Sequence, residues 1–546
     1  MEQKADLILI NGVIYSANAK DEVAEALAIK DGLIVEIGNS VQILKLKGQH
    51  TRVLDLNGQF VMPGLIEGHG HFLKLGKNLI NLDLLGTNSW KQIVQMVEEK
   101  ITKSAEGEWI DGRGWHQEKW IESPGLTFNS YPYHDELSAI SPNNPVVLTH
   151  ASGHALMANK KAMDLAGINP EVQSPGGGRI IKDLNGKLTG VFEENAMALI
   201  LGPLQIIKDS IPKDKSIEIL KTQAILASSE CIRYGITSFQ DAASNLDEIN
   251  LLKSWCDSGI IHNRLYVMLY NDFDKVLKEI ESLPIELNEN KKFSCHAVKA
   301  FVDGALGSYG AWLLHAYEDE KDFHGQNTMA MEKLAKLAEK CAQKNLQLCV
   351  HGIGDRGNRE ILNIFEEYLP KNKAHDLRWR IEHAQHLDTM DIPRFEQLGV
   401  IASIQAVHCT SDAPFVVKRL GVERSKKGAY AWRSLIDNGA RIANGTDCPV
   451  ESINPFQCMY AAITRKRLDN GMEFFPEQKL SRIEALRSYT IWNAYAAKEE
   501  NIKGSLEKNK LADFIIVDRN LLDCNDLELA SAKVEKVFIS GIEIKK

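Results

Sequence analysis

The chain lacks any run of apolar residues that approaches the roughly 18–20 needed to cross a membrane. It also lacks an excess of positive charge, because its formal net charge is −9 and its pI is about 6.0. This balance argues against nucleic acid as the main partner. The first residues, before position 7, contain no apolar signal-peptide core, so we expect a cytoplasmic protein.

Paired cysteines are also missing. The nine cysteines are an odd number, scattered along the chain without a Cys-x-x-Cys pair, which predicts buried or free thiols in a reducing compartment. Hydrophobic residues make up 44% and charged residues 25%, as in ordinary globular proteins. With 546 residues the chain is long enough to bury large cores and to form more than one domain.

Both ends of the chain have the pattern of short strands and tight turns. Residues 7–10 and 13–16 flank Asn11-Gly12, and residues 25–30 and 33–38 flank Asp31-Gly32, so two hairpins are predicted. Residues 512–518 and 533–544 are strand-like as well. Because neither end can bury a core alone, we expect residues 1–59 and 500–546 to form one composite β-sandwich domain.

The middle of the chain alternates helical and strand-like segments. Seven strands are expected after helical segments, at residues 235–240, 263–270, 294–303, 346–351, 377–383, 399–405 and 439–447. With the strand that ends at His69 they make eight. This alternation predicts an α/β fold, a TIM-type (β/α)8 barrel over residues 60–499.

One stretch breaks the alternation. Roughly 140 residues lie between His71 and Pro212, where a barrel needs a single βα unit. We interpret residues 72–212 as a large insertion after the first barrel strand, on the face where barrel active sites lie. A lid or substrate subdomain is the favoured interpretation, and a surface insertion without a function is the alternative.

A set of candidate metal ligands stands at the ends of the expected strands. His69 and His71 are two residues apart, so on a strand their imidazoles point to the same face and can hold one metal ion. Four further candidates follow at later strand ends: Lys299, His351, His383 and Asp447. Each alone has an ordinary structural alternative, such as a turn cap for Asp447. Together they predict a metal centre, because barrel strands converge at their carboxyl ends.

The motifs around these residues resemble the amidohydrolase superfamily, and within it the amidohydrolase-3, YtcJ-like branch. They lie at residues 63–71, 299–308, 351–356, 380–385, 403–408 and 445–450, with further matches in the insertion at residues 112–115, 152–154 and 176–179. The resemblance covers nearly the whole chain. N-substituted formamide deformylases belong to this branch.

The resemblance implies a binuclear centre, expected to hold two Zn²⁺. His69, His71 and Asp447 would bind one ion, and His351 and His383 the other. Lys299 would bridge both ions as a carbamate formed with carbon dioxide, because an ammonium group cannot bind a cation. Its strand is apolar, and burial there would lower the pKa of the amine and favour that reaction.

The same resemblance implies the chemistry. A metal-activated hydroxide would attack the substrate carbonyl, with Asp447 as general base and then general acid. His408 would contact the carbonyl oxygen or the tetrahedral intermediate, unless it is an ordinary loop histidine. Four further residues are candidates for substrate binding: Trp115, His154, Asp303 and Gln405. Packing inside the insertion is the alternative for the first two, and a turn for Asp303.

The favoured function is therefore a metal-dependent hydrolase of a non-peptide C–N bond, in an N-substituted amide or formamide. Hydrolysis of a cyclic amide or an ester, or deamination of an amidine, is the alternative on the same site. A non-catalytic binding or scaffold protein is a third possibility, disfavoured because all six candidate ligands are present. We expect a small-molecule substrate and neither a nucleic-acid nor a membrane partner, and a homo-oligomer is compatible with the sequence.

Overall fold

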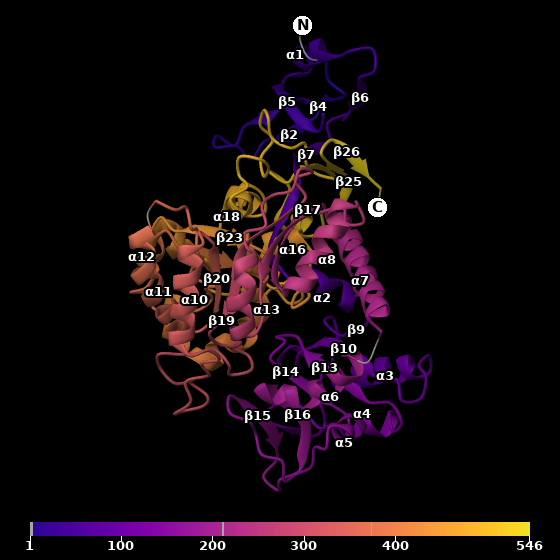
Figure 1. The fold of residues 1–546 in the computed structure, drawn as a ribbon, viewed down its shortest axis with the longest axis vertical. Coiled ribbons are helices and arrows are strands. Elements are labelled where there is room, and N and C mark those ends of the chain that lie inside the picture. Colours follow the sequence, from indigo (N-terminus) through magenta and orange to yellow (C-terminus); the bar gives the residue numbers. More distant parts are fainter. Residues whose placement is uncertain (1–3, 210–211, 373, 546) are drawn as a thin grey trace.

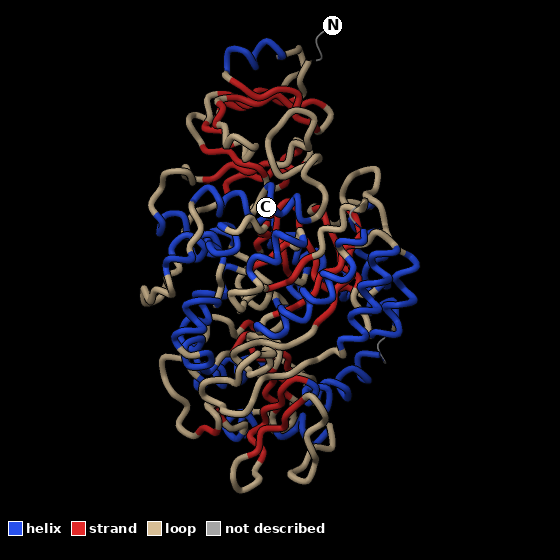
Figure 2. Tube along the Cα trace, turned by 90° about the vertical axis from the view of Figure 1, so that its left-hand side faces the viewer, coloured by secondary structure: helices blue, strands red, loops and turns tan. Residues whose placement is uncertain are grey.

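The computed structural model describes residues 4–209, 212–372 and 374–545. Figure 1 shows three parts along the long axis: β-sheets that contain both termini, a central barrel, and a further sheet with helices at the opposite end. Figure 2 shows the same order from the side. Among the described helices, none combines the length and apolar content that a bilayer span requires.

Eight parallel strands form the barrel, as predicted, and the α/β fold class is confirmed. Their order is β8 (Leu65–Gly70), β17 (Ile236–Ser244), β18 (Arg264–Leu269), β19 (Phe293–Phe301), β20 (Gln347–Gly352), β21 (Arg380–His383), β22 (Ile401–Ile404) and β23 (Arg441–Asn444). The strands are almost entirely buried, as parallel strands between an inner core and outer helices must be. Asn493 links the two end strands, because its amide donates to the carbonyls of Ile66 and Asn444 at 2.7 Å each.

Helices cover the outside of the barrel. They include α7 (Lys213–Arg233), α8 (Leu246–Asp257), α10 (Met331–Gln343), α11 (Asp355–Tyr368) and α12 (Ile392–Leu398). In α10 the buried side chains are Leu334, Leu337, Ala338, Cys341 and Ala342, the spacing of a single helix face. A capping box between Asn245 and Glu248 begins α8.

The two chain ends share one sheet. β24 (Phe514–Val517) lies between β25 (Val534–Ile539) and β7 (Phe60–Pro63), antiparallel to both. β2 (Val13–Tyr15) joins β7 in the same six-stranded sheet, with β3 (Val23–Ala24) and β26 (Ile542–Ile544) at its edges. Because β7 belongs to this sheet and β8 to the barrel, the chain leaves the sheet and enters the barrel at Gly64. The expected boundaries of the composite domain stay a prediction, and residues 1–3 and 546 lie outside the described ranges.

One predicted hairpin is confirmed and the other is wrong. β4 (Ala26–Lys30) and β5 (Leu33–Gly38) pair antiparallel around Asp31-Gly32. β1 (Leu7–Ile10) does not pair with β2, because it lies between β4 and β6 (Arg52–Asp55) in a separate four-stranded sheet. Asn11 instead turns the chain from one sheet to the other, with a φ of 56°. The reason is burial: apolar side chains of β1 and β2 meet in a core between the two sheets.

The insertion forms its own mixed sheet of six strands. The order is β15 (Gly178–Lys182), β16 (Leu188–Glu194), β14 (Ala155–Ala158), β13 (Val146–His150), β10 (Ile110–Trp115) and β9 (Leu82–Asp83). Helices α3 (Trp90–Ile101), α4 (Asp135–Ile140), α5 (Lys160–Leu165) and α6 (Ala198–Asp209) accompany it. Figure 1 places this sheet below the barrel, at the end away from the chain termini. Of the expected insertion, residues 210–211 lie outside the described ranges.

Candidate metal centre

The expected metal ligands converge at the carboxyl end of the barrel. The imidazole ring of His383 lies 5.0 Å from that of His69 and 4.4 Å from that of His351, between ring centroids. The carboxylate oxygen Oδ1 of Asp447 is 3.2 Å from His71 Nε2 and 3.6 Å from His69 Nε2. Residues from β8, β20, β21 and the loop after β23 thus meet at one point, although more than 300 positions separate the first from the last of them.

Buried polar atoms without a hydrogen-bond partner concentrate in this cluster. They are His71 Nδ1, Lys299 Nζ, His351 Nε2, His383 Nδ1 and Asp447 Oδ1. A buried polar atom without a partner costs about 1–3 kcal/mol, so proteins rarely gather several of them without a ligand. Imidazole nitrogens and carboxylate oxygens are the donors that Zn²⁺ and similar divalent ions take. The residues therefore fit a metal centre.

Two overlapping groups of described residues have the geometry of metal ligands. His69, His71 and Asp447 form one, and His383, His408 and Asp447 the other, with ligand atoms within 4.8 Å of one another in each. Asp447 belongs to both. His351 lies beside the second group, with Nε2 at 3.4 Å from Asp303 Oδ1.

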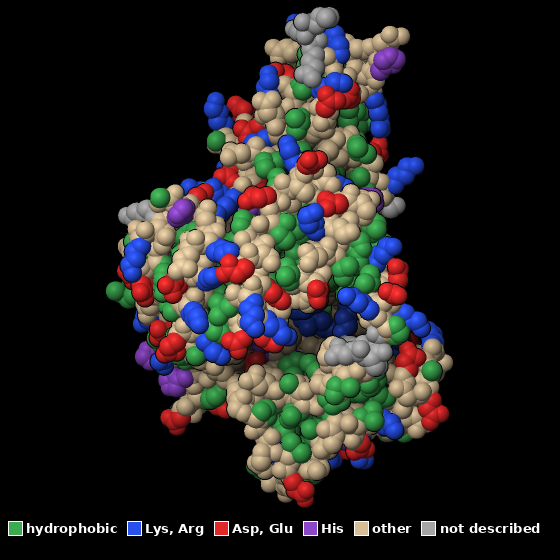
Figure 3. Space-filling model, in the orientation of Figure 1, with side chains coloured by type: hydrophobic (Ala, Val, Ile, Leu, Met, Phe, Trp, Pro, Cys, Tyr) green, Lys and Arg blue, Asp and Glu red, His purple; other side chains and the backbone are tan. Residues whose placement is uncertain are grey.

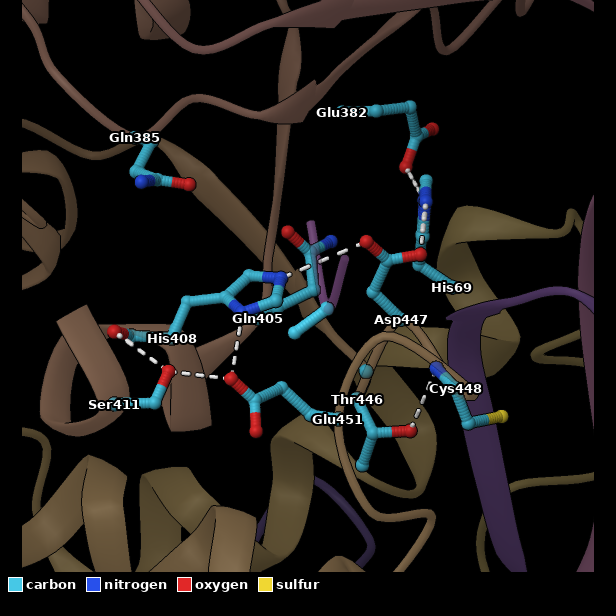
Figure 4. Close-up of polar contacts among 12 residues, drawn as sticks. His69, Glu382, Gln385, Gln405, His408, Ser411, Thr446, Asp447, Cys448 and Glu451 are labelled. Carbon is cyan, nitrogen blue, oxygen red and sulfur yellow. Dashed lines mark hydrogen bonds and ion pairs between the residues drawn. The ribbon is translucent and has the colours of Figure 1, made fainter. Parts of the chain in front are cut away.

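Glu382 fixes the orientation of His69. Its carboxylate oxygen Oε2 lies 2.5 Å from His69 Nδ1, the contact that is dashed in Figure 4. It also accepts a hydrogen bond from Arg380 Nη2 at 3.0 Å. Burial alone would raise the pKa of Glu382, but Arg380 and His69 hold it well below its usual range. The ionised carboxylate keeps the proton of His69 on Nδ1 and leaves Nε2 free toward the cluster.

Two of the candidate ligands depart from regular strand geometry. His383 has a φ of 76° and Asp447 a φ of 58°, which are uncommon for residues other than glycine. Glu382 and His383 are neighbours that would point to opposite faces of a regular strand. The turn of the backbone at His383 brings both side chains to His69. Backbone strain of this kind is typical of functional sites.

Lys299 is buried close to the histidines. It lies on β19, beside Cys349 of β20, and only 2% of its surface is exposed. Burial lowers the pKa of its ammonium to about 8, despite attraction from Glu382 and Asp447. The lowered pKa raises the share of the neutral amine near neutral pH, and this is the form that reacts with carbon dioxide.

His408 links Asp447 to a second carboxylate. Its Nε2 lies 3.6 Å from Asp447 Oδ2 and its Nδ1 lies 3.5 Å from Glu451 Oε1 (Figure 4). Burial alone would lower the pKa of His408, but these two carboxylates raise it to about 10. Ser411 also contacts Glu451. The imidazole is therefore a positively charged donor beside the cluster at neutral pH.

A cavity of about 490 Å³ opens over the cluster, between the barrel and the insertion. Figure 3 shows the hollow at this level, with Lys and Arg side chains inside it. The volume lies in the range of small-molecule sites, roughly 300–1,000 Å³. His154 lines it, and its Nδ1 lies 3.0 Å from Glu194 Oε2, a residue that no sequence pattern had indicated. Glu194 has a φ of 48°.

Three residues predicted to bind substrate do not reach this cavity among its described lining residues. Trp115 packs in the apolar core of the insertion, where its Nε1 donates a hydrogen bond to the Leu148 carbonyl at 2.8 Å. Its neighbour His116 is the residue that lines the cavity. Asp303 accepts the backbone N–H groups of residues 312, 353 and 354, and so anchors loops. Gln405 donates to the Ser403 carbonyl at 2.9 Å.

Known proteins with similar sequences give the family. The Amidohydrolase family matches residues 52–544. "Protein LONG AFTER FAR-RED 3" of Arabidopsis thaliana is 31% identical, covering 99% of this chain and 91% of that protein. "Putative amidohydrolase YtcJ" of Bacillus subtilis (strain 168) is 28% identical, with 97% of each covered. "N-substituted formamide deformylase" of Arthrobacter pascens is 25% identical, covering 99% of this chain and 98% of that protein.

A solved structure agrees with these sequence matches. An uncharacterized metal-dependent hydrolase from Pyrococcus horikoshii OT3 has a TM-score of 0.75 and 26% sequence identity, over 95% of this chain and 99% of that one. The resemblance to the amidohydrolase-3, YtcJ-like branch is thus confirmed along nearly the full length. The metal-ligand cluster lies within the matched residues, and the chain belongs to the amidohydrolase family.

Proposed function

We propose that this protein is a metal-dependent amidohydrolase that cleaves the non-peptide C–N bond of a small N-substituted amide or formamide. The observation that carries the proposal is the set of buried, unpaired imidazole, amine and carboxylate atoms beneath the cavity. The likeness to an N-substituted formamide deformylase, at 25% identity over nearly the full length, supports the type of bond.

The residues divide into two proposed metal positions. His69, His71 and Asp447 would hold one Zn²⁺, and His351 and His383 a second. When bound, such ions lower the pKa of water and polarise a carbonyl group. We further propose that the Lys299 amine reacts with carbon dioxide to form a carbamate, with loss of one proton, and that this carbamate would help to hold both ions. An amine with a pKa near 8 and no hydrogen-bond partner supports this, because the carbamate supplies two anionic oxygens.

The protein's own side chains would then move the proton and bind the carbonyl. Burial would raise the pKa of Asp447, but His408 and His71 keep it well below its usual range, so its carboxylate is ionised. Asp447 accepts the proton of the attacking water and passes it to the leaving nitrogen. The charged imidazole of His408 donates a hydrogen bond to the carbonyl oxygen as negative charge develops there.

A metal analysis and a substrate panel test the proposal together. Protein grown with added zinc is expected to hold about two divalent ions per chain by elemental analysis, and to hydrolyse some members of a panel of N-substituted formamides and amides. Asp447→Asn is expected to lower kcat/KM beyond about 100-fold with the fold retained, because an amide is not a general base. Asp437→Asn, at an exposed aspartate of α15 (Trp432–Asp437), is the control. Normal turnover by Asp447→Asn with metal bound would refute the mechanism.

A further inference from the structure

Charged side chains of both signs line the cavity, and its acidic members are Asp111, Asp412, Asp447 and Glu451. Besides the charged His408, its described lining includes four Lys and Arg side chains: Lys74, Lys77, Arg113 and Lys119. Two of them are neutralised locally. Lys77 Nζ lies 2.8 Å from Asp111 Oδ2, and Lys119 Nζ lies 3.4 Å from Glu451 Oε1. Arg113 and Lys74 are the two of these four that form no ion pair with a described residue.

Arg113 contacts only neutral oxygens among its recorded partners in the described ranges. Its Nη2 donates to the Ala151 carbonyl at 2.8 Å and its Nε to the Pro449 carbonyl at 3.5 Å. The other terminal nitrogen, Nη1, lies over Gly153, where an added Cβ would come within 3.4 Å of it. Arg113 is half-buried and lines the cavity. The two carbonyls hold the plane of its guanidinium in place.

Lys74 is the second cation without a counterion in the described ranges, and it is exposed to the cavity. Asp241, Asp447 and Glu248 attract Lys74 electrostatically without forming an ion pair with it. Asp241 accepts hydrogen bonds from the backbone N–H of Phe72 at 2.8 Å and from Ser244 Oγ at 2.6 Å. The ammonium group of Lys74 is thus left with electrostatic attraction at longer range and with solvent.

Both cations lie on the same side of the metal cluster. Lys74 comes one helical turn after His71, on α2 (Phe72–Asn78). Arg113 reaches the carbonyl of Pro449, two residues after Asp447. β8 and β23, which lead to these ligands, are the two end strands of the barrel order. The strands β19 and β20, in the middle of that order, contribute apolar surface through Phe301 and the residue after β20, Ile353. The cavity therefore has Arg113 and Lys74 on the side near Asp447, and apolar side chains on the other side.

We propose that Arg113 and Lys74 form a subsite for an anionic group of the substrate, a carboxylate or a phosphate. A guanidinium fork and an ammonium group with free N–H donors bind such groups through short, charge-assisted hydrogen bonds. The natural substrate is then an amide that carries a negative charge away from the bond that is cleaved. The reaction rests on the function proposed above, but the anion subsite itself can be measured without any reaction.

Binding of a sulfonate to the metal-loaded protein tests the subsite directly. Benzenesulfonate and its neutral isostere methyl phenyl sulfone are compared by calorimetry. The sulfonate is expected to bind at least about 10-fold more tightly, since hydrogen bonds to charged groups are worth about 1.5–3 kcal/mol. Arg113→Gln and Lys74→Gln are each expected to remove most of this preference. Lys77→Gln, at the paired lysine in the same cavity, is the matched control and should keep it. Equal binding of the two probes, or a preference that both cation variants retain, would overturn the proposal.

A kinetic comparison shows whether the subsite prefers a carboxylate or a phosphate. It also tests the subsite separately from the proposed reaction. Three N-formyl amines of equal chain length are compared, ending in a carboxylate, a phosphate or a methyl group. The charged member that fits is expected to have a kcat/KM about 10–100-fold above the methyl compound, and Arg113→Gln should erase that difference. Sulfonate binding without hydrolysis of any amide would support the subsite and contradict the reaction. Hydrolysis with equal kcat/KM for all three compounds would contradict the subsite alone.

Discussion

Replacing Glu382 by glutamine tests whether the carboxylate behind His69 sets the metal affinity. Glu382 is fully buried, and its Oε2 lies 2.5 Å from His69 Nδ1. Its other oxygen, Oε1, lies 2.7 Å from Arg380 Nε. Glu382→Gln keeps the size of the side chain and one acceptor oxygen, but it removes the charge that holds the His69 proton on Nδ1.

Two effects of known size follow from these contacts. Removing the carboxylate partner of a metal-binding histidine lowers metal affinity by about 10–100-fold, or about 1.4–2.7 kcal/mol. Breaking a buried ion pair by removing one partner costs about 3–5 kcal/mol of stability, since Arg380 is left buried without its counterion. The glutamine retains a hydrogen bond to one neighbour, so we expect values toward the lower end of both ranges.

The assay measures zinc affinity by competition with a chelator, and the free energy of unfolding in denaturant. The control is Asp513→Asn, which removes the partner of another fully buried arginine, Arg264, whose Nε lies 2.6 Å from Asp513 Oδ2. Arg264 lies on β18 and not among the metal ligands. Both variants should lose stability, but only Glu382→Gln should lose zinc affinity. An equal zinc affinity of Glu382→Gln and the wild type would refute the reasoning.

Three further predictions concern buried charges. Lys299→Ala is expected to lose at least one metal ion per chain by elemental analysis and nearly all activity, with partial recovery in formate; unchanged metal content would contradict a bridging role. Glu194→Gln is expected to lower the pKa of His154, followed by NMR, and to reduce kcat/KM about 10-fold, because a charge-assisted hydrogen bond is lost. Burial would raise the pKa of Asp513, but Arg264 lowers it from 3.8, so this carboxylate stabilises the fold fully above pH 3.8 and loses that effect as pH falls through its lower folded pKa. The stability difference between Asp513→Asn and wild type should therefore be constant above pH 3.8 and shrink below it; a difference that does not shrink would contradict the pairing.

The sequence determined the barrel and pointed to the candidate metal ligands. The period of the apolar residues changes between helix and strand along the chain, and this local signal is independent of distant residues. His69, Lys299, His351 and His383 lie near the ends of such strands, and any closed parallel barrel gathers strand ends at one mouth. The pairing of the two chain ends was predictable for another reason: neither end could bury a hydrophobic core alone.

Tertiary structure alone decided how the site is completed. The side chains of Glu382 and His383 both reach His69 because the backbone turns at His383. On a regular strand, neighbouring side chains alternate between faces, so these two would have pointed in opposite directions. The Asn11-Gly12 turn looked like a hairpin, but burial between two sheets decided its pairing, and the same competition placed Trp115 in a core instead of the pocket. Glu194 and His154 both come from the insertion, and they meet only through folding, without any sequence spacing that marks Glu194. Local patterns determine periodicity and strand ends, whereas contacts between distant segments depend on packing of the whole chain.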